Sequence, residues 1–296
     1  MRALRRTPTR AVLLALVMLA ISFRADAAPA NFIWKATNAS GKVIYLAGSI
    51  HLLSPDFYPL AAPFEQAFDS SDTLVEELDM GEMLSPDAQM MMVMRGMLPA
   101  GQTLDKVVSA KTLALVKGAV DELGIPLLPL TQFKPWMLAI TLQSIEWEKA
   151  GFDANLGLDK HFYDKAVATG KRVQGLETLD YQISRFDGMT PDAQDRLLAE
   201  TVTELASTQE MLTNVADAWK SGNTARLEQL VLDDLKSEPE LYERLLADRN
   251  ANWLPKIEAL FAAPRPSLIV VGAAHLIGPD GLLQALRNKG YTITPL

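Results

Sequence analysis

Two of the three histidines in this chain lie in the same local setting, each three residues after a glycine. His51 ends a Gly-x-x-His segment that begins at Gly48, and His275 ends another that begins at Gly272. A glycine at this offset lets the backbone take a positive φ or lets a ligand approach closely. Because imidazole serves as a proton shuttle or a metal ligand near neutral pH, we interpret the two motifs as parts of one site.

Acidic residues follow predicted strands in the same way. Glu77 lies near the end of a strand predicted over residues 72–78, and Glu177 follows a shorter one predicted over residues 171–175. The carboxyl ends of parallel strands share one edge of a sheet, and ligands gather outside that edge. We therefore expect His51, Glu77, Glu177 and His275 to meet there.

Two imidazoles and a carboxylate can support either of two hydrolytic reactions. Nitrogen and oxygen ligands suit zinc, manganese, cobalt or iron(II), and three of them leave coordination positions open for water and substrate. Such an ion lowers the pKa of bound water and polarises a carbonyl group. Without a metal, one histidine oriented by Glu77 would be a general base toward water that attacks an ester. The helix-borne zinc-protease motif His-Glu-x-x-His is absent from the sequence.

The elements that must position these residues follow a strand-helix-strand order. A hairpin is predicted over residues 32–47, with turn-forming residues at 38–41, and the chain closes with a helix over 278–289 and a strand over 291–294. Such units favour parallel strands with right-handed crossovers. We expect an α/β fold: a mainly parallel central sheet covered by helices on both faces, with an N-terminal hairpin and helical insertions. The predicted helical regions span residues 59–68, 104–123, 135–150, 159–168 and 191–261.

The first 27 residues have the composition of a signal peptide. A basic leader precedes an apolar stretch over residues 11–21, and Ala25-Asp26-Ala27 supplies the small residues of a cleavage site. Residues 28–296 are then predicted to form one domain that is periplasmic or secreted. Removing the leader changes the formal net charge from −8 to about −12, which argues against a nucleic-acid partner and against membrane association after cleavage. The chain has no cysteine, which excludes disulfides and thiolate chemistry.

Five segments of the sequence resemble the TraB/GumN family. They are residues 44–51, 77–79, 157–159, 171–178 and 270–276, and the resemblance extends from about Asn31 to Pro295. This family is similar to the Tiki proteins, membrane-tethered metalloproteases dependent on manganese or cobalt, and more remotely to erythromycin esterase and ChaN-like proteins. The resemblance implies an α/β core whose active centre contains His51, Glu77 and His275.

We therefore expect an exported hydrolase that cleaves a peptide or protein substrate. In this hypothesis His51, Glu77 and His275 hold one divalent metal ion, manganese or cobalt before zinc, and the ion activates water. Two alternatives remain open from the sequence. One is a metal-independent esterase that uses a histidine and Glu77, and the other is a protein that binds haem or a peptide without catalysis.

Four further features have competing interpretations. Glu76 and Glu77 would point to opposite faces of a strand, and Glu77 is preferred because it matches the family's Glu-apolar-Asp pattern, which leaves Glu76 to cap or solvate an edge. Glu177 is expected to have an orienting or structural role rather than to be a ligand, and His161 to lie on the surface or half-buried. Seven of the twelve methionines lie between Met80 and Met97. A helix that packs into the core is the preferred interpretation there, over a mobile apolar wall of the site and over copper(I) binding.

Overall fold

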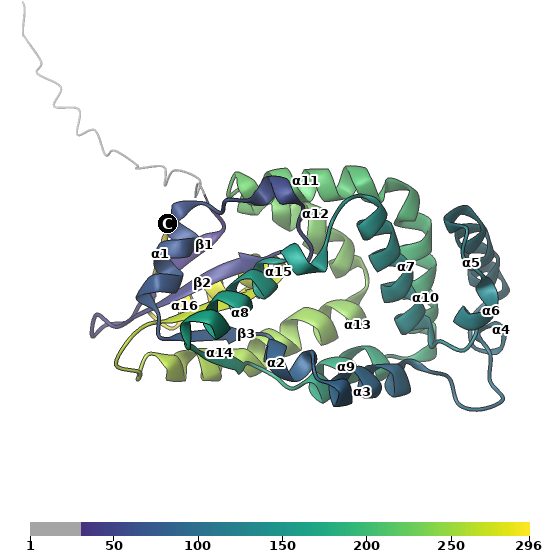
Figure 1. Ribbon diagram of the computed structural model, residues 1–296, viewed down its shortest axis with the longest axis horizontal. Coiled ribbons are helices and arrows are strands. Elements are labelled where there is room, and N and C mark those ends of the chain that lie inside the picture. The colour runs from purple at the N-terminus through teal and green to yellow at the C-terminus, as the bar shows by residue number, and fades with distance from the viewer. Residues whose placement is uncertain (1–30) are drawn as a thin grey trace, which may run out of the picture.

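The structure is a computed structural model, and it describes residues 31–296. The predicted signal peptide, residues 1–27, lies outside the described residues. Figure 1 shows one sheet surrounded by helices, with a group of helices extending to one side. The predicted α/β class, with a mainly parallel sheet and helices on both faces, is confirmed. Across residues 31–296, none of the helices has the length and apolar character needed to cross a membrane.

The sheet contains six strands in the order β4-β3-β5-β2-β1-β6. In chain order they are β1 (Ile33–Thr37), β2 (Val43–Ser49), β3 (Thr73–Glu76), β4 (Arg172–Gly175), β5 (Ser267–Gly272) and β6 (Thr292–Pro295). The four strands β4, β3, β5 and β2 are parallel, whereas β1 is antiparallel to both β2 and β6. The central strand β5 has a continuous apolar run, as expected for a strand that helices cover on both faces.

The predicted N-terminal hairpin is formed by β1 and β2. The Asn38 side chain accepts hydrogen bonds from the backbone N–H groups of Ser40 and Lys42. Gly41 adopts a φ of 79°, which a residue with a side chain rarely adopts. Turn chemistry at these positions therefore fixes the register of the hairpin.

The register of the parallel strands brings their carboxyl ends to one edge. Ser49 at the end of β2 pairs with Gly272 at the end of β5. Glu76 at the end of β3 pairs with Val270 of β5 on one side and with Gly175 of β4 on the other. Segments that are far apart in the sequence thus leave the sheet side by side.

Helices pack against the sheet in distinct groups. Helices α1 (Ala62–Ser70) and α8 (Leu158–Thr169) pack together through the stacked rings of Phe68 and Phe162. Helix α14 (Asp248–Leu260) contacts α16 (Leu282–Asn288). These helices and the strands share one apolar core.

A second apolar cluster lies in the helical insertions, away from the sheet. It joins α5 (Ala110–Leu123), α7 (Pro135–Lys149) and α10 (Pro191–Glu204) through residues such as Val120, Leu142 and Leu198. The remaining helices are α2 (Met80–Met83), α3 (Pro86–Gly96), α4 (Leu104–Val107), α6 (Leu127–Leu130), α9 (Leu179–Asp187), α11 (Thr208–Lys220), α12 (Thr224–Ser237), α13 (Pro239–Tyr242) and α15 (Ala273–Leu276).

The methionine-rich segment differs from its preferred interpretation. It forms the two helices α2 and α3, but only Ala88 and Gly96 of α3 are buried. The side chains of Met90 and Met94 are 61% and 69% exposed. The prediction of a core helix was wrong, because α3 packs through small residues: a Cβ atom on Gly96 would lie 2.4 Å from the Met137 side chain.

The last predicted helix is also shorter than expected. We predicted a helix over residues 278–289, but α16 begins only at Leu282. Gly278 has a φ of 79°, so the chain turns there instead of starting a helix. A separate turn of helix, α15, comes earlier and contains His275.

Candidate active site at the carboxyl ends of the strands

His51 follows β2 and presents its imidazole to solvent. Its Nδ1–H donates to Oδ2 of Asp159 in the first turn of α8, over 2.8 Å. The Asp159 carboxylate raises the pKa of His51 to about 9, against the opposing effect of burial. Because the imidazole is 57% exposed, water screens this attraction and moderates the shift.

Gly157 brings Asp159 to His51. A Cβ atom on Gly157 would lie 2.1 Å from the carbonyl oxygen of His51, so only glycine permits this approach of the two backbones. The backbone N–H of Leu158 donates to the carbonyl of Ile50, which anchors the start of α8 on the end of β2. The segment at residues 157–159 therefore has a clear structural role, because it places the Asp159 carboxylate next to the His51 imidazole.

His275 lies on α15 and is buried. Its Nε2 is 3.0 Å from Nη1 of Arg249, and its Nδ1 is 2.7 Å from Oδ1 of Asn250. A guanidinium only donates hydrogen bonds, so we assign Nε2 as the acceptor and Nδ1–H as the donor to Asn250. Burial lowers the pKa of His275 to about 3, which agrees with this neutral tautomer.

Glu77 lies between the two histidines. Its Oε1 accepts from the backbone N–H of Gly272 over 2.8 Å, and its Oε2 accepts from Nη2 of Arg249 over 2.5 Å. The Nε2 atoms of His51 and His275 are 4.0 and 3.9 Å from Oε1. Burial opposes ionisation, but the Arg249 guanidinium, helped by His51 and the backbone N–H of Gly272, holds the pKa of Glu77 far below its usual value.

Gly272 forms the floor of this arrangement. A Cβ atom there would lie 3.1 Å from Oε1 of Glu77 and 3.6 Å from both Nε2 of His51 and Cδ2 of His275. Its φ is −47°, and Gly48 also lacks a positive φ. The glycines of the two Gly-x-x-His motifs are therefore needed for close packing and not for a left-handed backbone.

Arg249 on α14 is the residue that sequence reasoning missed. It donates to Glu77, to His275 and to Glu177, with 2.7 Å between Nη2 and Oε1 of Glu177. Charged side chains on amphipathic helices usually face solvent, but Arg249 is buried. Its pairing with two buried carboxylates is the physical reason for the exception.

Glu177 contacts Arg249 and not the histidines. Its Oε2 accepts from Nε1 of Trp253 over 2.8 Å, and Nε2 of Gln182 lies 3.3 Å from Glu77 and 3.2 Å from Glu177. Burial raises the pKa of Glu177 although Arg249 favours its charged form. These contacts hold the guanidinium in place and leave Glu177 out of reach of a ligand at His51.

Glu76, the neighbour of Glu77, takes no part in these hydrogen bonds. It is only 2% exposed, and within residues 31–296 neither of its carboxyl oxygens has a hydrogen-bond partner. The expectation that Glu76 solvates an edge was wrong, because β3 is an interior strand whose end is enclosed. Burial, and after it the Asp159 carboxylate, raises the pKa of Glu76 to about 9, so this side chain is mainly protonated at neutral pH.

A cavity of about 330 Å³ opens at this edge of the sheet. Its wall combines the polar groups of the site with an apolar side from α2 and its neighbours. The lining residues are His51, Leu52, Glu76, Glu77, Leu78, Met80, Met83, Leu84, Ala154, Asn155, Asp159, Lys160 and Gln182. The combination of an apolar wall with a few convergent polar groups is typical of a ligand site.

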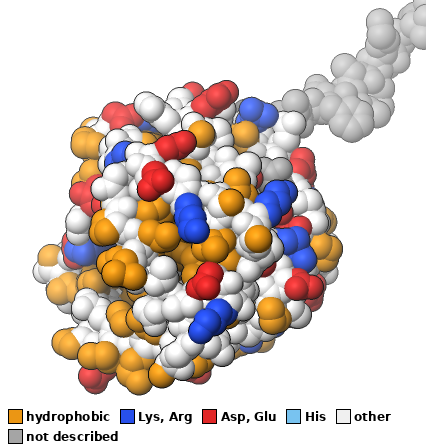
Figure 2. Space-filling model, turned by 90° about the vertical axis from the view of Figure 1, so that its right-hand side faces the viewer, with side chains coloured by type: hydrophobic (Ala, Val, Ile, Leu, Met, Phe, Trp, Pro, Cys, Tyr) orange, Lys and Arg blue, Asp and Glu red, His pale blue; other side chains and the backbone are white. Residues whose placement is uncertain are grey.

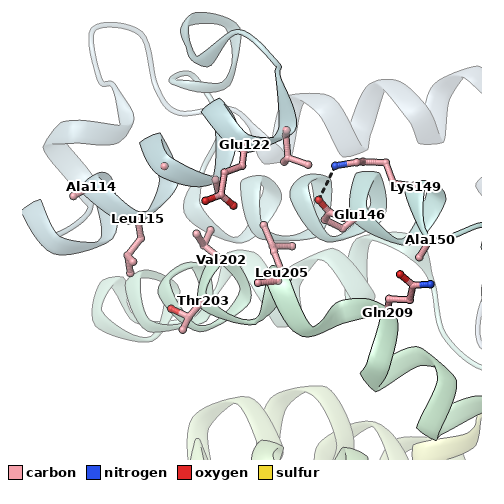
Figure 3. A pocket seen from close by; sticks show the side chains of 14 residues that line it. Ala114, Leu115, Glu122, Glu146, Lys149, Ala150, Val202, Thr203, Leu205 and Gln209 are labelled. Atoms are coloured by element: carbon pink, nitrogen blue, oxygen red, sulfur yellow. Dashed lines mark hydrogen bonds and ion pairs between the residues drawn. The ribbon is translucent and has the colours of Figure 1, made fainter.

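A larger cavity lies elsewhere, between α5, α7 and α10. It measures about 650 Å³, and Figure 3 shows its lining, in which Lys149 pairs with Glu146. Figure 2 views the molecule from the side of the helical insertions and shows hydrophobic side chains in the middle of this face with charged ones among them. Within the described part of the chain, the lining of this cavity contains no histidine.

The third histidine lies away from both cavities. His161 on α8 has its Nε2 3.1 Å from Oε1 of Glu65, and its side chain is 25% exposed. It is half-buried, which is one of the two placements that the sequence predicted.

The predicted metal ligands do not fit a divalent ion as they are arranged. Two ligands of a tetrahedral ion with bonds of about 2.1 Å lie about 3.4 Å apart, less than the 3.9 and 4.0 Å between the imidazoles and Glu77. The lone pair of His275 Nε2 and one oxygen of Glu77 are already engaged by Arg249. Among residues 31–296, no three His, Asp or Glu side chains form a group that could hold a metal ion.

Comparisons with known proteins identify the family of this chain. The model of the TraB/PrgY/gumN family matches residues 32–295. The chain is 29% identical over 261 residues to the uncharacterized protein YbaP of Escherichia coli strain K12, and equally similar to YbaP of Shigella flexneri. Each match covers 87% of this chain and 94% of the relative. No solved structure matches this chain.

Proposed function

Since this chain belongs to the TraB/PrgY/gumN family, we propose that it is an exported hydrolase whose reaction takes place at His51, beside Glu77 and His275. The observation that carries the proposal is the pairing of His51 with Asp159 at a cavity. An accessible imidazole whose second nitrogen donates to a carboxylate is the arrangement expected of a general base. The sequence pointed to Glu77 as the orienting acid, whereas the contacts favour Asp159.

In this mechanism His51 removes a proton from water through Nε2 as the water oxygen bonds to the scissile carbonyl carbon, and the imidazolium then gives that proton to the leaving nitrogen or oxygen as its bond to carbon breaks. The imidazolium that forms has Asp159 on one side and Glu77, 4.0 Å away, on the other, so two carboxylates stabilise the positive charge as it develops. Because the pKa of His51 is about 9, only a fraction of the enzyme has the basic form at neutral pH. The rate is therefore expected to rise with pH until it levels off near pH 9.

The neutral His275 and the ionised Glu77 have a positioning role in this proposal. Arg249 fixes both, because it donates to His275 Nε2 and to Glu77 Oε2. The negative charge of Glu77 thus stays at a fixed place beside His51. Preorganised charge of this kind lowers a barrier more than a side chain that must reorient.

The substrate we propose is a peptide or protein. Its support is the apolar side of the cavity, where Leu52, Met80 and Met83 could receive an apolar side chain next to the scissile bond. Thioether side chains adapt to varied shapes, which suits substrates whose side chains differ.

The metal-dependent peptidase predicted from the sequence is the second candidate. It is favoured by the two imidazole Nε2 atoms that approach the same oxygen of Glu77. A manganese, cobalt or zinc ion there would require Arg249 to release His275 and Glu77. Binding of haem or of a peptide without cleavage is the third candidate, and the absence of hydrolysis in the same experiment would favour it.

The experiment uses purified protein, fluorogenic peptides and p-nitrophenyl esters, with and without a chelator. We expect hydrolysis that the chelator does not affect, and a loss of about 100-fold or more in His51→Ala. His161→Ala is the matched control, since it removes an imidazole outside the cavity, and it should keep full activity. Equal activity of His51→Ala and wild type would refute the proposal. Activity lost with the chelator and restored by manganese or cobalt would replace it with the second candidate.

A further inference from the structure

The side of the cavity formed by Glu76 has no role in the mechanism above. Glu76 lines the cavity and is 2% exposed, and in the described chain neither oxygen has a partner at hydrogen-bond distance, although the backbone N–H of Met80 lies near enough to favour the charged form. The other carboxylates of the site are bonded: Asp159 by His51, Glu77 by Arg249 and Gly272, and Glu177 by Arg249 and Trp253. Glu76 therefore differs from the other acidic residues of the site, whose carboxylates all accept hydrogen bonds from side chains or from the backbone.

A buried carboxyl group without a partner is costly, and such groups are rare in folded proteins. Replacing it with an apolar residue would remove that cost, so its presence calls for a partner that binds from outside. Burial keeps Glu76 mainly protonated in the free protein, and a cationic hydrogen-bond donor that binds beside it would favour the carboxylate and release that proton to solvent. Because Glu76 faces the cavity lining, a ligand in the cavity is the source of that donor.

The charges of the lining favour a cationic donor. Glu76, Glu77 and Asp159 provide three acidic groups. Of the two basic groups in the lining, His51 pairs with Asp159 and Lys160 pairs with Asp164. The remaining wall is apolar, with Leu52, Leu78, Met80, Met83 and Leu84.

We propose that this cavity is a subsite for a primary ammonium group carried on an apolar stem, with Glu76 as the acceptor of its hydrogen bonds. The stem would lie along Met80, Met83 and Leu84. Two sources have this chemistry: the amino terminus of a peptide with an apolar first residue, and the side chain of a lysine. The assignment of this ammonium group to a substrate rests on the proposed hydrolase activity. The proposed binding of the ammonium group by Glu76 does not rest on it.

The experiment measures binding by calorimetry with four probes. Leucinamide represents a peptide amino terminus, and Nα-acetyl-lysinamide represents a lysine side chain. N-acetyl-leucinamide and Nα,Nε-diacetyl-lysinamide are the blocked controls, since each lacks the ammonium group but keeps the stem. At least one amine is expected to bind, and its blocked form to bind about 10–100-fold more weakly. Whichever amine binds more tightly identifies the source.

Variants locate the acceptor. Glu76→Met should weaken binding of the amine about 10–100-fold, and Glu76→Gln, which keeps an acceptor but loses the charge, about 10-fold. Glu82→Gln is the matched control, because it makes the same change at an exposed position of α2, and it should bind as wild type does. Thermal unfolding of each variant shows that it is folded.

Two results would overturn the proposal. One is that neither amine binds wild-type protein, and the other is that amine and blocked probes bind equally to wild type and Glu76→Met. His51→Ala separates this inference from the proposed function, since it should lose hydrolysis but retain amine binding. Amine binding without hydrolysis in wild type would contradict only the proposed function.

Discussion

The two cavities described above differ in the elements that form them and in their chemistry. The larger one lies between α5, α7 and α10, and its lining contains one surface ion pair, Lys149 with Glu146. The smaller one lies at the carboxyl ends of the parallel strands and gathers a histidine and three acidic side chains, next to a buried arginine. Cavity volume alone would direct attention to the larger cavity, whose lining contains no histidine among the residues that the structure describes. The strand ends are the better guide, because separate segments of the chain each deliver one functional residue there.

Breaking the ion pair at each cavity should give the largest contrast. Arg249→Met leaves the buried carboxylates of Glu77 and Glu177 without their counter-ion, and we expect the free energy of unfolding to fall by about 3–5 kcal/mol. Lys149→Met breaks a pair whose lysine is about half exposed, and it should cost less than about 1 kcal/mol. Urea unfolding of both variants measures the difference. Similar losses would mean that the Arg249 network does not stabilise the fold.

Replacing Glu76 should change the free energy of unfolding in the opposite direction. Glu76→Met replaces a buried carboxyl group that makes no hydrogen bond, so we expect a gain of about 2 kcal/mol near neutral pH. The pKa of Glu76 is raised from 4.5 to about 9, so its contribution to stability is fully present below pH 4.5 and is lost as the pH rises toward 9. The gain of the variant should therefore grow over this range. Unfolding measured across it tests both sign and slope, and a destabilised variant would contradict the prediction.

The His51–Asp159 pair should produce a smaller, pH-dependent effect. The pKa of His51 rises from 6.5 to about 9 on folding, so the stabilisation is complete below pH 6.5 and is lost as the pH rises through 9. Because the imidazole is 57% exposed, we expect Asp159→Asn to cost only about 1 kcal/mol near pH 6 and less near pH 10. The same variant should move the rise of the hydrolysis rate to lower pH. Glu146→Gln, at the other cavity, should change neither curve.

Two glycines, one in the lining of the larger cavity and one packed against Glu77 and the histidines, are expected to give the smallest difference. A Cβ atom on Gly118, inside α5, meets no atom within 4 Å, so Gly118→Ala should stabilise the protein by about 0.5–1 kcal/mol and leave activity unchanged. Gly272→Ala places its methyl group 3.1 Å from Glu77 Oε1, and it should lower activity. Thermal unfolding and peptide hydrolysis measure the two responses. Equal activity of the two variants would show that close packing at Gly272 does not matter for the reaction.

Much of the frame of this site could be predicted from the sequence, since strands and their ends follow local patterns. Strand composition and turn residues identified the hairpin and β5, and the strand-end argument brought His51, Glu77 and His275 to one edge, where the structure has them. Their chemical role stays a prediction. The residues that hydrogen-bond to these side chains could not be predicted in this way. Arg249 is 172 residues away from Glu77 in the sequence, and it lies on a helix whose amphipathic pattern resembles that of the neighbouring helices. Only the packing of α14 on the sheet selects that arginine.

The burial of Glu76 could not be predicted from the sequence, for a related reason. Alternation along β3 predicts that Glu76 and Glu77 face opposite ways, but β3 ends at Glu76 and both side chains line the same cavity. Asp159 was visible within a motif, yet its contact with His51 depends on the close approach of Gly157 to the end of β2. Such approaches are decided by tertiary packing, and local sequence patterns do not contain them.

The strand order has a consequence for how the chain reaches this state. Strand β5 lies between β3 and β2 but is made after residue 266, so until then the sheet can exist only as two separate pieces, β1 with β2 and β3 with β4. Each piece would expose an unpaired edge able to join another copy. Pairings between such distant segments are slow to form. Folding should therefore be late and cooperative, with aggregation as its main competitor, and chains ending before β5 should yield insoluble material instead of a half-active domain.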